Sequence, residues 1–161
     1  MKLVKVGKIV NTHGIKGELR ILSDFEFKSD VFVPGNTLYL GINKNKEEIK
    51  TYRHHKNYEM VTLGDYTNIN EVLNYVGNNV YFDRDLLEVD YLLDDLVGME
   101  VSILGELFGK VREIVYNGGR ILLGITYDKD YFIPYVNEFI VNVDVTNKII
   151  EVSEMTRGLI I

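Results

Sequence analysis

The chain has 161 residues, of which 46% are hydrophobic and 26% charged, a balance typical of a soluble globular protein. It has no cysteine, which excludes disulfides, thiolate zinc sites and cysteine nucleophiles. No apolar run approaches the roughly 18 residues that a membrane helix needs, and the N-terminus alternates charged and apolar residues, unlike a signal peptide. We therefore expect a cytoplasmic protein that does not enter a membrane.

Charge is divided unevenly along the chain. Residues 1–88 carry twelve Lys/Arg and twelve Asp/Glu, whereas residues 89–161 carry six and twelve, so the whole net charge of −6 lies in the second part. This split predicts two domains with different partners, the first tolerating RNA phosphate and the second favouring a basic protein. An uneven division by chance is the alternative.

The first notable segment is the loop His13-Gly14-Ile15-Lys16-Gly17, which two strand-like runs flank. Its two glycines allow positive φ and a close backbone approach, while His13 and Lys16 supply a titratable ring and a cation. With Arg20 close behind, such a loop can present backbone N–H groups and charge to RNA phosphate. A hairpin turn in which the glycines serve only the backbone is the alternative.

Apolar residues alternate at period two between turn clusters throughout the first part, which is typical of a β barrel or sandwich. We expect six strands, at residues 4–10, 19–22, 37–42, 49–54, 58–63 and 80–82. Six strands are enough to close a small barrel. One short helix is expected from Asn68, paired with Glu71 as a cap, to Gly77, with Ile69, Val72, Leu73 and Val76 on one face.

A mixed-charge segment at residues 82–90 marks the connection, so we expect one domain at residues 1–86 and another at 87–161. The second part opens with a helical turn at 92–96 that Gly98 ends, and a strand follows at 99–103. Residues 105–109 are expected to form a turn. Further strands are expected at 110–116, 121–125, 131–133, 140–145 and 148–152, which makes a second small β barrel.

Catalytic and metal sites are not indicated. The three histidines show no spacing typical of a nucleophile and its base, and no glycine-rich phosphate loop enters a helix. His54 and His55 are neighbours on a strand, so they point to opposite faces and cannot both approach one ion without a bulge. An enzyme using His13 remains the competing class of function, and we expect no catalytic or metal-binding residue.

Taken together, these segments resemble the bacterial ribosome maturation factor RimM family over nearly the whole chain. In the first part, the resemblance rests on VGKIV (6–10), HGIKGELR (13–20), SD (23–24), GD (64–65) and NEVL (70–73) before Gly77. In the second part, it rests on Tyr91, DLVGMEV (95–101), GELFGKV (105–111), FIPYV (132–136) and RGLI (157–160).

The resemblance implies a mainly β fold of two small barrels: an N-terminal six-stranded barrel of the translation-factor type with one short helix, and a C-terminal PRC-barrel. It also implies a monomeric, non-catalytic assembly chaperone without a cofactor. Its partners would be the small (30S) ribosomal subunit with its 16S rRNA, and the nineteenth protein of that subunit. The alternative is a PRC-barrel adaptor that binds another basic protein.

The family's PRC-barrel opens with two adjacent aromatic residues linked to subunit association. Tyr91 matches the first, and Leu92 stands where the second would be, so an exposed Leu92 could add apolar contact area. Tyr91 is expected to anchor the partner protein or, alternatively, to pack between the domains. Asp94 and Asp95 are expected to cap the strand entry or face solvent. For the RNA or subunit contact, the expected residues are His13, Gly14, Lys16, Gly17 and Arg20.

Overall fold

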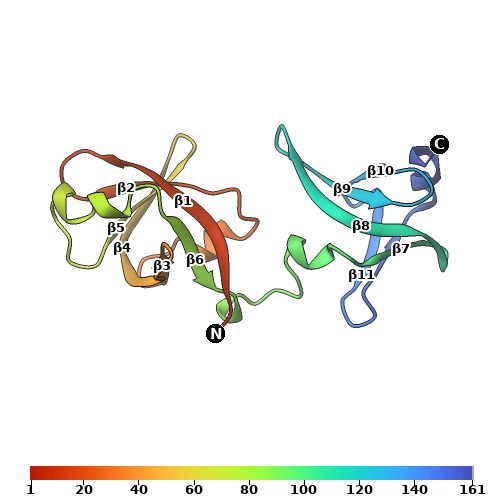
Figure 1. Ribbon diagram of the computed structural model, residues 1–161, viewed down its shortest axis with the longest axis horizontal. Helices are drawn as coiled ribbons and strands as arrows, with labels where there is room; N and C mark the ends of the chain where they lie inside the picture. The colour runs from red at the N-terminus through yellow and green to blue at the C-terminus, as the bar shows by residue number, and fades with distance from the viewer. Residues whose placement is uncertain (161) are drawn as a thin grey trace. The chain divides into compact units, whose positions relative to one another are not determined.

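The computed structural model describes residues 1–160 and shows two compact units, Met1–Glu88 and Val89–Ile161 (Figure 1). Both are built mainly from β-strands, as expected from the alternating sequence pattern. The units are described separately below.

The first unit is a closed barrel with the strand order β1-β2-β5-β4-β3-β6. Every neighbouring pair in it is antiparallel. The strands are β1 Leu3–His13, β2 Glu18–Leu22, β3 Thr37–Leu40, β4 Asn45–His55, β5 Tyr58–Leu63 and β6 Asn79–Asp83. The six expected strands are thus confirmed, and the barrel closes where β1 pairs with β6.

Alternation along the strands explains the barrel interior. Leu19 and Ile21 on β2 are fully buried, while Glu18 and Arg20, which alternate with them, are only partly buried. A strand points successive side chains to opposite faces, so one set fills the barrel and the other lies outside. The outward-facing set therefore supplies the surface from which any binding site of this unit must be built.

The short helical segment expected near Asn68 is present, but it is of the 3-10 and not the α type. The segment forms two consecutive 3-10 turns, η1 Ile69–Glu71 and η2 Leu73–Tyr75, separated by Val72 at φ −120° and ψ −1°. Val72 and Tyr75 are buried, whereas Leu73 and Val76 are exposed. The buried pair is three residues apart, which is the period of a 3-10 helix and not the α-helical period assumed from the sequence.

Both residues of the expected cap do act at this turn. The Asn68 side chain accepts a hydrogen bond from the Asn70 N–H at 2.8 Å, and Glu71 Oε1 accepts one from the Thr67 N–H at 3.1 Å. The α-helix of the unit lies elsewhere, as the single turn α1 Lys28–Val31, which the sequence pattern did not predict.

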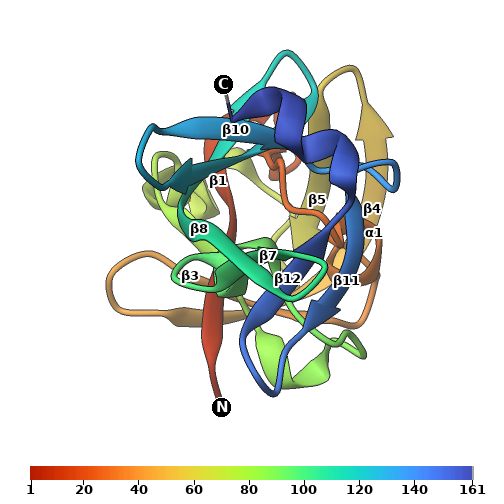
Figure 2. The same cartoon turned by 90° about the vertical axis from the view of Figure 1, so that its right-hand side faces the viewer.

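The second unit is a six-stranded sheet in the order β10-β9-β8-β7-β12-β11. Its strands are β7 Glu100–Ile103, β8 Glu106–Asn117, β9 Arg120–Thr126, β10 Tyr131–Pro134, β11 Ile140–Asp144 and β12 Ile149–Val152. The β12–β7 pair is parallel and the other pairs are antiparallel. A 3-10 turn, η4 Leu93–Leu96, precedes β7, and η5 Glu154–Leu159 lies against β10 (Figure 2).

One turn expected in this unit is wrong. The chain reverses at Leu104 and Gly105, both at positive φ, and β8 then begins at Glu106 and passes straight through Gly109. A Cβ built at Gly109 would lie 2.6 Å from the Thr126 carbonyl oxygen on β9. Gly109 is therefore needed for the close approach of two strands and not for a turn.

Candidate interaction surfaces

A groove of about 350 Å³ lies on the second unit beside β11. Strand β11 is at the edge of the sheet, with β12 on one side, so one row of its backbone groups faces away from any strand of this unit. Val136 and Val141 line the groove and are 48% and 59% exposed. The other lining residues are Asp90, Tyr91, Tyr135, Asn137, Ile140, Asn142 and Val143.

Tyr91 lies in this groove together with Tyr135. Their hydroxyl groups are hydrogen-bonded to each other, and both rings are partly buried. Tyrosine combines a large apolar ring with a polar tip, which suits the centre of an interface. Tyr135 was not among the expected site residues. It belongs to the FIPYV segment, but no spacing in the sequence indicated that it would meet Tyr91.

Leu92 does not lie on this surface. Its side chain is only 4% exposed, so the expectation of an exposed leucine is wrong. The Leu92 N–H donates a hydrogen bond of 2.8 Å to Asp95 Oδ2, which fixes Leu92 at the start of η4 with its side chain withdrawn from solvent. Asp95 thus caps η4, and not the entry of the strand as expected from the sequence. Tyr135, and not residue 92, is thus the aromatic neighbour of Tyr91.

In the first unit, the β1–β2 loop has the positive φ angles that its glycines predicted. Gly14 and Gly17 have φ values of +68° and +92°. The Ile15 carbonyl accepts a hydrogen bond of 2.9 Å from the Ile69 N–H, and a Cβ on Gly17 would lie 3.5 Å from the Asn68 backbone. Both glycines therefore have a structural role. The loop is held against the 3-10 turn with Lys16 exposed.

His13 and Arg20 are in direct contact at the base of this loop. Arg20 Nη2 lies 2.6 Å from His13 Nδ1. A guanidinium can only donate hydrogen bonds, so His13 Nδ1 acts as the acceptor in this arrangement. The Arg20 guanidinium also lies 5.7 Å from the centre of the Tyr58 ring. A pocket of about 430 Å³ beside them is lined by His13, Gly14, Ile15, Lys16, Glu18 and Thr62.

Strand β4 adds basic groups that the sequence analysis missed. The Arg53 guanidinium donates two hydrogen bonds to the Glu18 carboxylate, at 2.8 and 2.9 Å, and they lower the pKa of Glu18. The His55 ring centre is 6.0 Å from that of His13. Desolvation and then the charges of Arg53 and Lys56 lower the pKa of His55. Only the pairing register of β4, β5 and β2 could have indicated this grouping.

His54 faces a different environment from His55. Its Nδ1 lies 3.0 Å from Glu59 Oε2, and Glu59 is buried and also accepts a hydrogen bond of 2.7 Å from Tyr52. Across residues 1–160, no three His, Asp or Glu side chains form a group that could hold a metal ion. The same residues contain no helix long and apolar enough to cross a membrane.

Comparisons with known proteins cover both units. The family model described as the RimM N-terminal domain matches residues 4–87, and the one described as the RimM PRC barrel domain matches residues 93–155. Proteins called ribosome maturation factor RimM from Bacillus anthracis and Bacillus cereus are each 34% identical to this chain over 170 residues. Each alignment covers 99% of both proteins.

Solved structures give two further matches. A crystal structure of a RimM-type 16S ribosomal RNA processing protein from Pseudomonas aeruginosa is 20% identical, with a TM-score of 0.49 over 94% of this chain and 97% of that one. The solution structure of the N-terminal domain of RimM from Thermus thermophilus is 21% identical, with a TM-score of 0.46 over 55% of this chain and 98% of that one.

Proposed function

Because the chain belongs to the RimM family of ribosome maturation factors, we propose that it assists assembly of the small-subunit head and processing of 16S rRNA. It acts in the cytoplasm as a monomeric, non-catalytic chaperone without a cofactor, and it binds the small subunit and its nineteenth protein. The observation that carries this proposal is the family match across both units, with 34% identity over 99% of the chain.

The partner protein binds at the groove beside β11, with Tyr91 and Tyr135 as its aromatic anchors. Two exposed valines, Val136 and Val141, supply apolar area around them. The second part of the chain carries six Lys/Arg against twelve Asp/Glu, and Asp90 lines the groove itself. Ribosomal proteins are basic, so this charge favours their approach and orientation. Leu92 is only 4% exposed and does not line the groove, so it is not part of the proposed contact.

The β1–β2 loop provides a separate contact with the subunit or its rRNA. Lys16 is exposed at its tip, and Arg20 is anchored by His13 at its base. Gly14 and Gly17 allow the chain to follow the backbone path that presents these groups. This contact and the groove lie on different units.

Sucrose-gradient sedimentation of the tagged full-length chain tests the proposal. We expect co-sedimentation with free small subunits more than with assembled ribosomes. Purified nineteenth protein should also be captured directly by the tagged chain. A chain that stays only at the top of the gradient contradicts the proposal. Capture of a different basic protein, without any subunit-associated fraction, would instead support the adaptor function.

A further inference from the structure

One outer face of the first unit collects basic side chains from two hairpins that are separate in the sequence. The β1–β2 hairpin contributes three of them and the β4–β5 hairpin the other three. We call this group the cationic face: His13, Lys16, Arg20, Arg53, His55 and Lys56.

The pairing of the strands explains why these groups meet. Strand β5 lies between β2 and β4 in the barrel. Met60 on β5 is paired with Arg20 on one side and with Arg53 on the other. Neighbouring strands are about 4.8 Å apart, so the backbones of the two arginines lie about 10 Å from each other. Direct contacts then fix the face: Arg20 with His13, and His13 with His55.

Charge on this face is nearly all of one sign. Glu18 is the carboxylate in contact with it, and Arg53 already binds both of its oxygens. Desolvation is the main cause of the lowered pKa of His55, and the neighbouring charges, Arg53 and Lys56 first, lower it further. Lys16 and Lys56 are exposed at the tips of the two hairpins. The face therefore attracts anions along its whole length.

We propose that the cationic face binds the phosphate backbone of double-helical RNA. The side chains that define the face are basic, with the exposed Ile15 as the large apolar side chain of the loop, whereas the centre of a protein interface is depleted of charged residues. Single-stranded RNA is bound largely by stacking on open aromatic rings. The rings of this face already have neighbours: the Arg20 guanidinium lies 5.7 Å from the centre of the Tyr58 ring, and the His13 and His55 rings contact each other. This inference rests on the proposed function in one respect, namely that rRNA is the polyanion that the protein meets during subunit assembly.

Glu18 has a defined part in this proposal. Its carboxylate competes with phosphate for Arg53. Replacing it by glutamine removes the competing charge while keeping a similar shape. Glu18→Gln should therefore bind duplex RNA more tightly, with a steeper salt dependence by about one unit of slope. A residue that only supports the fold would weaken binding or leave it unchanged when substituted.

The test uses the full chain and a fluorescein-labelled RNA duplex of about 20 base pairs, chosen to exceed the roughly 16 base pairs that double-stranded RNA-binding domains span. Anisotropy titrations between about 50 and 200 mM KCl give the salt slope. Lys16→Gln/Lys56→Gln should lower the slope by about two, because the two exposed phosphate contacts at the hairpin tips are lost. Lys56→Gln alone, at an exposed turn, should lower it by about one and does not disturb the Glu18 pair.

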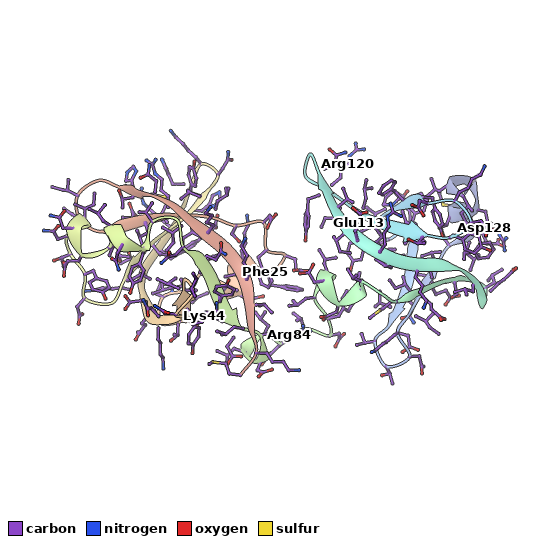
Figure 3. All side chains as sticks on the ribbon, viewed as in Figure 1. Phe25, Lys44, Arg84, Glu113, Arg120 and Asp128 are labelled. Atoms are coloured by element: carbon purple, nitrogen blue, oxygen red, sulfur yellow. The ribbon has the colours of Figure 1, made fainter. Side chains whose placement is uncertain are left out.

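The matched control is Lys5→Gln/Lys46→Gln, which removes the same charge outside the cationic face. On adjacent strands, Lys5 lies opposite Tyr81 and Lys46 lies opposite Tyr39, and the two tyrosines lie opposite each other. Lys44, which is labelled in Figure 3, lies 3.8 Å from the centre of the Tyr81 ring. The control should leave the slope unchanged. An equal decrease of the salt slope in both double variants would mean that net charge alone drives binding, and this result would overturn the inference.

Other outcomes are also decisive. No binding of duplex RNA by the wild-type chain, or an unchanged slope in Lys56→Gln, would overturn the inference. A failure of the proposed function looks different, because the wild-type chain would then stay at the top of a sucrose gradient. Co-sedimentation of all variants with small subunits, together with unchanged duplex binding, would reject only the cationic face.

Discussion

Tyr91→Ala gives the sharpest separation between a partner site and simple packing. The substitution removes a partly buried ring and its hydrogen bond to Tyr135 from the groove beside β11. An aromatic anchor at an interface typically contributes about 2 kcal/mol or more, so we expect Kd for the nineteenth ribosomal protein to rise at least about 30-fold. Stability should fall by only about 1 kcal/mol, because the ring is not fully buried.

Isothermal titration with the purified partner measures this change, and thermal unfolding of each variant confirms the fold. Tyr127→Ala is the matched control, since Tyr127 is 37% exposed on the same unit and contacts Phe108 outside the groove. It should leave Kd unchanged. Tyr91→Phe keeps the ring and loses the hydroxyl, so its effect should be smaller, about 1 kcal/mol. An unchanged Kd in Tyr91→Ala would show that the tyrosine only packs.

Three further predictions concern the fold. Gly109→Ala should destabilise the chain by about 3 kcal/mol through its clash with β9, whereas Gly105→Ala, in open space, should cost about 1 kcal/mol in denaturant titrations. Leu92→Tyr should lower the melting temperature without tightening partner binding, because the site is buried. The hydrogen bonds from Arg53 lower the pKa of Glu18 from 4.5 on folding. The stability that the Glu18–Arg53 pair contributes is therefore fully present above pH 4.5, and it is lost as the pH falls through the lowered pKa of the folded state. The stability difference between wild type and Glu18→Gln should shrink accordingly, and a constant difference would refute the pairing.

Local sequence rules predicted the features that depend on neighbours along the chain. Alternating apolar residues predicted the six strands of the first barrel, and the loop glycines predicted the positive φ of Gly14 and Gly17. The rules could not assign contacts that depend on strand register. Arg53 reaches Glu18 only because β5 stands between β4 and β2, and Tyr135 meets Tyr91 across a similar sequence distance.

The errors in the prediction arise where the local sequence does not show the contacts that a residue makes in the fold. Gly109 was read as a turn residue because its conformational freedom is visible in the sequence, whereas the nearness of Thr126 is not. The 3-10 turns were read as a helix because the cap signals are shared by both structures. An exposed Leu92 was considered from its place in a motif, but side-chain burial is decided by the packing around it.

The parallel pairing of β12 with β7 has a consequence for synthesis of the chain. The residues that pair in the two strands lie about 50 positions apart, so the middle of the second sheet stays incomplete until β12 has left the ribosome. All the strands of the first barrel are available much earlier. The first barrel can therefore form while the groove beside β11 does not yet exist, so the proposed RNA contact would be available before the proposed protein site.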